Sequence, residues 1–431
     1  MKVMIAILSG VLLFSCCMAG CVTGGNDSSS TEDKTKNLPL YVEDYENLTY
    51  TKDGYTERIS SPFWQGNVIY NEIALPFKAD DGTAAATLLY KPTKVISVMD
   101  QKLEKTYVEG VDYTVDKQNG KLIIPEGSSI PLISDKADTG ESQYVPEGYE
   151  RVYDMSMSGN QFLVWDIQGN KPFVYTESSY FYAKYLSITY AYDANELPDS
   201  LFYKTDKTML YKLRKKLENG EDISLVTIGD SITQGCSSTG DFLHVAPNTP
   251  CYASQLKTEI ERVYGVNVKL TNSGVGGTVS GYPLTGEGSS ALNNALNAKP
   301  DLCIIAYGMN DSTSSPVVDG YQYGENIKEI MARIRAVSPE CNFILVNSFP
   351  CNPLYERELG IFDNYLKKLK AISNDNVDGS VAVVDMQSVG KYFLNRKKFC
   401  EISSSNVNHP NDFMHRVYCM NIMSVLTDYK K

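Results

Sequence analysis

The feature that most constrains the fold is the alternation of apolar runs and helix-like segments after residue 204. Five short, nearly continuous apolar runs occur at 223–228, 266–270, 301–307, 343–347 and 381–385. Segments with helical composition or spacing lie before and between them and close the chain, at 206–219, 252–264, 291–298, 325–337, 355–372 and 412–428. Strands that are apolar on both faces must be covered on both faces, so this half is predicted to be a parallel sheet between two helical layers.

The preceding part of the chain has a different period. Short alternating or β-branched runs occur at 67–70, 86–90, 121–125, 161–165 and 185–192. Turn signals such as Asn119-Gly120 separate them, which is typical of an all-β sandwich or barrel. Many of the 30 tyrosines lie here. Tyrosine is a common strand former and core residue, and an exposed tyrosine can also stack on a sugar ring.

A chain of 431 residues is long for a single core, so two domains are expected. We predict an α/β protein with an open C-terminal α/β domain preceded by an all-β, sandwich-like domain. The predicted segments are a leader, a polar tether, the β domain, a linker and the α/β domain, at 1–21, 22–45, 46–200, 201–221 and 222–431.

The first 21 residues, MKVMIAILSGVLLFSCCMAGC, have the pattern of an export signal. The apolar stretch at 3–14 is too short to span a bilayer, which takes about 20 residues. The segment Met18-Ala-Gly-Cys21 resembles a bacterial lipobox, which implies lipidation of Cys21 and a membrane-anchored, exported lipoprotein. An ordinary cleaved signal peptide is the alternative. The polar residues that follow have nothing to bury, as expected of a tether.

Charge and cysteine content exclude several classes of function. The formal net charge of -12 argues against a nucleic-acid partner, because phosphate binding requires clustered Lys and Arg. Seven of the ten cysteines follow residue 235 at irregular spacing, without a C-x-x-C pair. This is neither a zinc pattern nor a regular disulfide framework. No metal or cofactor is expected.

Four segments at the predicted strand ends carry residues suited to chemistry: 229–231, 271–277, 308–311 and 406–415. Each by itself is a common turn or helix cap. In a parallel α/β sheet, however, the carboxyl ends of the strands meet at one edge, where ligands bind. Together the segments supply a Ser nucleophile, a His base, Gly backbone N–H groups and an Asn amide, which are the components of acyl transfer.

The order and spacing of these segments resemble the GDSL or SGNH hydrolase family over about residues 222–428. The resemblance implies a flavodoxin-like, three-layer α/β/α domain with serine esterase activity. On this resemblance Ser231 is the nucleophile and His409 the general base, and the Ser231 N–H, Gly277 and Asn310 form the oxyanion hole.

Two details refine the resemblance. Gly277 is preferred to Gly276 because it stands five residues after Asn272, as the family's Asn-x-Gly-x-x-Gly block requires. No G-x-S-x-G elbow surrounds Ser231, which distinguishes the chain from the α/β-hydrolases. Asp230 is expected to fix the turn by hydrogen bonding.

The chain departs from the family at the Asp-x-x-His block, where Asn406 replaces the Asp. The group that orients His409 therefore stays open between the Asn406 side-chain oxygen, a backbone carbonyl and Asp412. Asp412 is expected in the first turn of the last helix, where a carboxylate favours the free N–H groups. Of the other histidines, His415 is the only nearby rival to His409, and His244 lies in a loop.

An exported serine site beside a Tyr-rich β domain is expected to act on short acyl esters of carbohydrate, with O-acetyl groups foremost. The small polar segments 237–240 and 311–315 favour a short acyl group. A lipase or thioesterase of the same fold is one alternative. An inactive, carbohydrate-binding surface lipoprotein is another, and Asn406 is the feature in its favour.

Overall fold

The computed structural model describes residues 40–50, 60–141, 144–153, 159–166, 169, 171–196, 201–202, 206, 208–355, 360–427 and 429. The expected leader, Cys21 and most of the expected tether lie outside these residues, as do parts of the expected linker. Within the described part of the chain, no helix has both the length and the apolar character required to cross a membrane.

Five parallel strands form the sheet of the C-terminal half. They are β12 (Ile223–Gly229), β13 (Val268–Gly274), β14 (Leu302–Ala306), β15 (Asn342–Asn347) and β16 (Val381–Asp385). Their spatial order is β13-β12-β14-β15-β16, and each neighbouring pair is parallel. This is the 2-1-3-4-5 order of flavodoxin-like sheets, whose ligands bind between the first and third strands at their carboxyl ends. The predicted fold class is confirmed.

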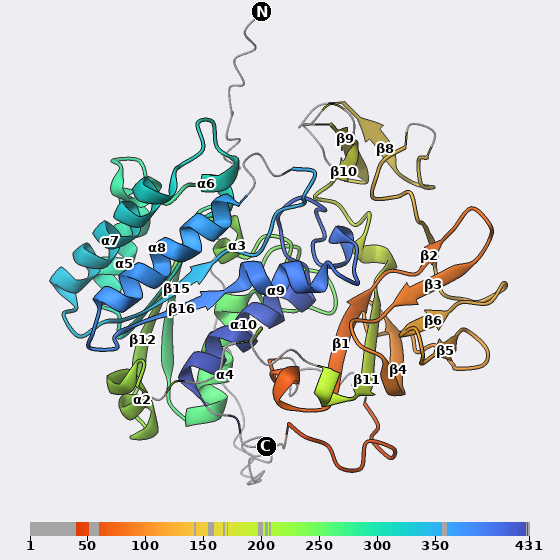
Figure 1. Cartoon of the computed structure of the whole chain (residues 1–431), viewed down its shortest axis with the longest axis horizontal. Helices are drawn as coiled ribbons and strands as arrows, with labels where there is room; N and C mark the ends of the chain where they lie inside the picture. Colours follow the sequence, from red (N-terminus) through yellow and green to blue (C-terminus); the bar gives the residue numbers. More distant parts are fainter. Residues whose placement is uncertain are drawn as a thin grey trace, which may run out of the picture. The chain divides into compact units, whose positions relative to one another are not determined.

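Helices cover both faces of this sheet (Figure 1). One face carries α4 (Tyr252–Tyr264) and α10 (Asp412–Leu426), and the other carries α5 (Ser289–Ala298), α7 (Gly320–Val337) and α8 (Ile361–Asp375). Shorter helices are α2 (Tyr211–Glu218), α3 (Ser231–Gln234), α6 (Met309–Thr313) and α9 (Met386–Phe393). Every residue of α10 is buried, including the polar side chains of Asp412, His415 and Arg416.

The N-terminal half is rich in strands, as expected, and its described residues contain three small sheets. One contains β1 (Val68–Ala74), β11 (Leu186–Tyr192) and β4 (Pro92–Asp100). A second contains β5 (Thr114–Asp116), β6 (Lys121–Ile123), β3 (Ala84–Thr87), β2 (Phe77–Lys78) and β7 (Ile133–Ser134). The third contains β10 (Phe173–Tyr175), β9 (Gln161–Trp165) and β8 (Glu150–Val152). Short 3₁₀ helices are η2 (Phe63–Gln65), η3 (Tyr182–Lys184), η4 (Ala194–Glu196), η5 (Tyr282–Leu284) and η6 (Phe399–Glu401).

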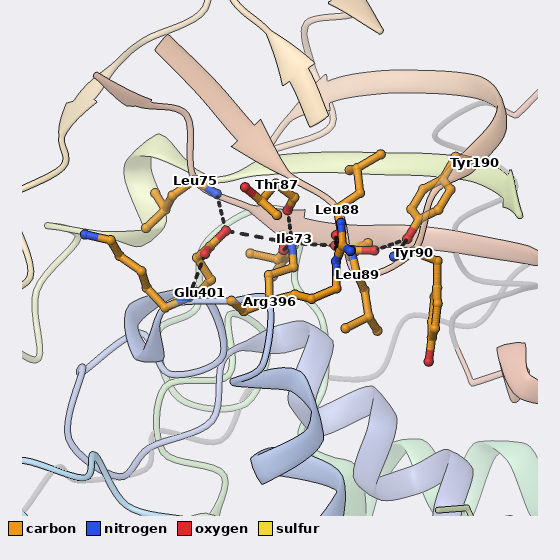
Figure 2. A network of polar contacts seen from close by, with 12 residues as sticks. Ile73, Leu75, Thr87, Leu88, Leu89, Tyr90, Tyr190, Arg396 and Glu401 are labelled. Carbon is orange, nitrogen blue, oxygen red and sulfur yellow. Dashed lines mark hydrogen bonds and ion pairs between the residues drawn. The ribbon is translucent and has the colours of Figure 1, made fainter. Parts of the chain in front are cut away.

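A buried charge network joins the two halves, and Figure 2 shows its hydrogen bonds and ion pairs. Lys397, just before η6, places its Nζ 2.5 Å from Oε1 of Glu72 on β1 and 3.7 Å from Oε1 of Glu401. The same ammonium donates to the carbonyls of Ile73 and Thr87. Because all three charged side chains are almost fully buried, each depends on the others for its counter-charge.

The seven cysteines after residue 235 are all free and buried. Burial raises the pKa of Cys236 and of Cys251 to about 12, so their thiols stay protonated at neutral pH. They act as small apolar core residues.

Candidate active site

The turn after β12 places Ser231 at the carboxyl end of a central strand. Asp230 caps α3, and its Oδ1 accepts a hydrogen bond from the N–H of Ile232 at 3.0 Å. A Cβ at position 229 would lie 2.2 Å from Oγ1 of Thr233 and 2.4 Å from the carbonyl oxygen of Ala306, so only glycine fits there. The tight turn makes Ser231 the first residue of α3.

His409 faces this serine from the loop before α10. Its Nε2 lies 3.0 Å from Oγ of Ser231, within hydrogen-bonding distance for proton transfer. The hydroxyl of Ser405 shapes the loop by accepting from the backbone N–H groups of residues 407, 408 and 409. Only 4% of Ser231 is accessible. The glycine-rich turn after β13 packs against it, since a Cβ at Gly276 would be 3.6 Å from that of Ser231.

The other ring nitrogen of His409 faces a residue that the sequence analysis did not single out. Oε1 of Glu177, just after β10 in the strand-rich half, lies 2.9 Å from Nδ1 of His409. The hydroxyl of Tyr175 donates to the same oxygen at 3.0 Å, and that of Ser237 to Oε2 at 3.5 Å. Glu177 precedes His409 by 232 residues and belongs to no motif. The one signal in the sequence was Asn406 in place of the Asp of the Asp-x-x-His block, which indicates that an orienting acid would have to lie in another segment.

Asn406 and Asp412, the two side chains predicted to orient His409, have other partners. The amide of Asn406 donates to the carbonyls of Asp138 at 3.2 Å and Val174 at 2.9 Å. Asp412 is the first residue of α10, as expected, but its carboxylate accepts from the backbone N–H and the hydroxyl of Thr239, at 2.9 and 2.7 Å. The structure therefore places Glu177, and neither of these residues, at Nδ1. A local motif could not reveal this, because the contact depends on how the two halves pack.

Burial and neighbouring charges set the protonation of the site. Burial lowers the pKa of His409, but the charge and hydrogen bond of Glu177, together with the charge of Asp230, raise it on balance above its ordinary value. Burial raises the pKa of Asp230 to about 7 and that of Asp311 to about 6. A histidine with a raised pKa is a stronger base for removing a proton from a serine hydroxyl.

The predicted oxyanion donors come from three neighbouring strand ends. Ser231 follows β12, Gly277 lies in the turn after β13, and Asn310 lies on α6 after β14. Gly277 has φ of +75°, which a residue with a side chain adopts only with strain. Nδ2 of Asn310 donates to the carbonyl of Thr278 at 3.1 Å, which links the second and third strand ends. An amide carries two protons, so this bond leaves one for a ligand.

The remaining histidines have structural positions. Nε2 of His415 lies 3.1 Å from the carbonyl oxygen of Cys236, and burial lowers its pKa to about 4. His244 is exposed, with Nδ1 2.9 Å from the carbonyl oxygen of Gly240. Within the described residues, no three His, Cys, Asp or Glu side chains are grouped so that they could hold a metal ion.

The family model described as the GDSL-like Lipase/Acylhydrolase family matches residues 227–417. The match begins within β12 and ends within α10, so it includes all the predicted site residues of the C-terminal half. No curated protein matches the chain.

Several solved esterase structures are similar to part of the chain. A two-domain esterase active on acetylated mannans, crystallised with mannopentaose, is 21% identical with a TM-score of 0.39. The match covers 53% of this chain and 57% of that one, so it spans little more than half of that esterase. A catalytic mutant of an acetylxylan esterase from Geobacillus stearothermophilus is 17% identical, with 48% and 96% covered and a TM-score of 0.39. An acetyl xylan esterase, AlAXEase, is 15% identical, with 47% and 98% covered and a TM-score of 0.37.

Proposed function

Residues 227–417 form a domain of the GDSL-like lipase/acylhydrolase family, and from this premise we propose that the protein is a serine esterase that removes short acyl groups, foremost acetyl, from carbohydrate. The observation that carries the proposal is the 3.0 Å contact between Nε2 of His409 and Oγ of Ser231 at the carboxyl edge of the sheet. A serine beside a base at this edge is suited to nucleophilic catalysis.

In the proposed reaction Oγ of Ser231 attacks the ester carbonyl while Nε2 of His409 takes its proton. Negative charge develops on the carbonyl oxygen, where the N–H groups of Ser231 and Gly277 and the amide of Asn310 stabilise it. The alcohol then leaves with the proton from His409, and the acyl group stays on Ser231. A water molecule, deprotonated by His409, hydrolyses this acyl-enzyme and restores the serine.

An aromatic cluster beside the site supports carbohydrate as the alcohol part of the substrate. Trp165 on β9 lies 5.3 Å, centroid to centroid, from Tyr355 of the C-terminal half and 5.9 Å from Tyr175 on β10. All three are partly exposed, and Tyr175 contacts Glu177 next to His409. Aromatic faces bind the apolar faces of sugar rings, so the cluster provides a binding surface adjoining the serine.

The confined space around Ser231 supports a short acyl group. The nucleophile is 4% exposed, and the turn through Gly276 closes one side of it. Of the small polar segments 237–240 and 311–315, Ser237 contacts Glu177 beside the site, whereas other residues have a structural role. Ser238, Thr239 and Asp311 are buried and hydrogen-bonded within the fold, so they do not form a polar rim around the site.

The nucleophile is tested by Ser231→Ala. We expect kcat for p-nitrophenyl acetate to fall by about 10⁴-fold or more, because the proposed acyl-enzyme forms on the Ser231 hydroxyl. The melting temperature should stay close to that of the parent, since the substitution removes one hydroxyl. Retention of most of the activity would contradict the proposal. Comparison of acetate, butyrate and decanoate esters then tests chain length, with kcat/KM expected to fall as the chain lengthens.

The aromatic surface is tested by Trp165→Ala. We expect KM for an acetylated oligosaccharide to rise about tenfold, as a lost stacking contact of about 1 kcal/mol or more implies, while kinetics on p-nitrophenyl acetate stay unchanged. Tyr153→Ala is the matched control, because that tyrosine is 88% exposed on the same half of the chain. Equal KM values in the Trp165 variant and the parent would remove the support for carbohydrate.

We also propose that the leader exports the protein and that Cys21 carries the lipid, because Met18-Ala-Gly-Cys21 resembles a lipobox. Incorporation of labelled palmitate should be lost in Cys21→Ala. The protein should then move from the membrane fraction to the soluble fraction. Labelling that persists without Cys21 would contradict this.

A further inference from the structure

We propose that Glu177 of the strand-rich half takes the place of the acid missing from the Asp-x-x-His block, and that Asn406 clamps the His409 loop against the strand that presents it. Glu177 is thus a positioning residue, acting through His409. The inference rests on the proposed function, because it assigns a role within the same site.

The first step is the geometry at Nδ1. A carboxylate 2.9 Å from Nδ1 of His409 accepts a hydrogen bond from the N–H at that position, which keeps the proton on Nδ1 and leaves Nε2 free to accept from Ser231. The Tyr175 hydroxyl holds the same carboxylate oxygen at 3.0 Å and limits its movement. The Glu177 side chain is 32% exposed and that of His409 14%, so the pair lies at the mouth of the site with the histidine further inside.

The second step is the change of role at position 406. Asn406 adopts φ of +59°, and its Nδ2 donates to the backbone carbonyls of Asp138 and Val174. Val174 belongs to β10, only three residues before Glu177. A carboxylate at position 406 has no proton to donate and would face two carbonyl oxygens. Asn at this position therefore fits a clamp and does not fit an orienting acid.

Further bonds fix the same junction. The backbone N–H of Thr176 donates to the carbonyl of Ser405 at 3.3 Å, so the residue next to Glu177 is hydrogen-bonded directly to the His409 loop. On the other side, Nδ2 of Asn352 donates to the carbonyl of Asn406 at 2.8 Å. The loop with the base is thus held between the strand-rich half and the segment after β15, and its distance to Glu177 is set by backbone contacts.

The other acids near the site are engaged elsewhere. Asp412 accepts from Thr239 and Asp230 caps α3. The titratable groups that bear on His409 are Glu177 after β10, Asp230 before α3 and His415 on α10. Of these, only Glu177 lies within hydrogen-bonding distance of the ring nitrogen that must carry the proton.

The decisive experiment compares Glu177→Gln with the parent and with Glu150→Gln, a control at an exposed glutamate in the same small sheet. We expect kcat for p-nitrophenyl acetate to fall by about 10³- to 10⁴-fold in Glu177→Gln, because an amide can select the wrong imidazole tautomer. The control should match the parent, and the melting temperatures of all three should agree. Glu177→Asp keeps the charge on a shorter side chain and should recover part of the loss.

The pH profile separates positioning from packing. Activity requires neutral His409, so kcat/KM rises with pH through the pKa of His409. Removing the Glu177 charge lowers this pKa, while Asp230 and His415 are unchanged, so the acid limb of Glu177→Gln should move to lower pH. If the acid limb of the kcat/KM profile does not move in Glu177→Gln and kcat is unchanged, Glu177 does not have the proposed role. If Ser231→Ala is inactive in the same assay, the proposed esterase would still stand.

The clamp is tested by Asn406→Asp, with Asn408→Asp as the control in the same loop. We expect Asn406→Asp to lose at least tenfold in kcat with a lower melting temperature, and the control to lose neither. The double variant Asn406→Asp with Glu177→Gln should be no more active than Glu177→Gln alone. Recovery of activity in the double variant would show that position 406 can supply the acid and would overturn the inference.

Discussion

At the scale of single residues, the site divides into a part that sequence reasoning reaches and a part that it does not. Ser231, Gly277 and Asn310 follow successive strands of one sheet, so their placement at one edge could be predicted from the strand pattern. Glu177 could not, because its contact with His409 depends on side-chain packing between distant segments. The role of Asn406 was equally out of reach, since its partners are backbone carbonyls of the other half.

Asp412 provides a test at this scale, because it was a candidate for orienting His409. Its buried carboxylate accepts from Thr239 and Gln101, so Asp412→Ala leaves buried donors without a partner. We expect the free energy of unfolding to fall by about 2–3 kcal/mol, with kcat per folded molecule within about threefold of the parent. Denaturant unfolding and kcat normalised to titrated active sites measure the two effects. A thousandfold loss of kcat without loss of stability would make Asp412 part of the site.

At the scale of elements, the hydrophobic pattern predicts which strands form the sheet better than it predicts where each strand begins and ends. The predicted strand 381–385 and helix 252–264 coincide with β16 and α4, whereas the strand predicted at 266–270 is found at 268–274. Asn272 and Gly274 have the composition of a turn, yet they pair in register with Thr227 and Gly229 of β12. The neighbouring strand therefore extends β13 beyond its apolar run, which a local pattern cannot indicate. Helix α9 was missed.

The end of β12 yields a prediction for Gly229→Ala. The added Cβ would lie 2.2 Å from Oγ1 of Thr233 and 2.4 Å from a carbonyl oxygen, and the backbone there can move little. We expect unfolding to become easier by about 1–3 kcal/mol, as for other overpacked sites, with a parallel loss of activity. Gly286→Ala is the control, because nothing lies within 4 Å of its added Cβ. Thermal unfolding of the two variants should differ clearly; equal melting temperatures would contradict the close packing of this turn.

At the scale of the whole molecule, buried polar contacts join the two halves in addition to the covalent linker. The described residues belong to one compact unit, and the Lys397 network lies across the junction within it. Arg416 on α10 adds to the junction by donating to the backbone carbonyls of Tyr70 and Asn71. The sequence changes period near residue 204, but this change does not indicate that these charges would be buried between the halves.

Lys397→Met tests this junction. The substitution leaves the carboxylates of Glu72 and Glu401 buried without their counter-charge, and we expect a loss of about 3–5 kcal/mol in the free energy of unfolding. Lys212→Met removes an exposed pair with Glu340 and should cost less than about 1 kcal/mol. Urea unfolding measures both. A small effect of Lys397→Met would mean that water or neighbouring donors replace the ammonium.

The position of Glu177 also has an evolutionary consequence. A Ser-His pair that borrows its acid from another part of the chain cannot be inherited as a separate module. Recombination that exchanged the first 200 residues for another β-rich segment would keep Ser231 and His409 but remove Glu177. Positions 177 and 406 should therefore be retained together among natural relatives that keep this junction: where Asn stands at 406, Glu should stand at 177.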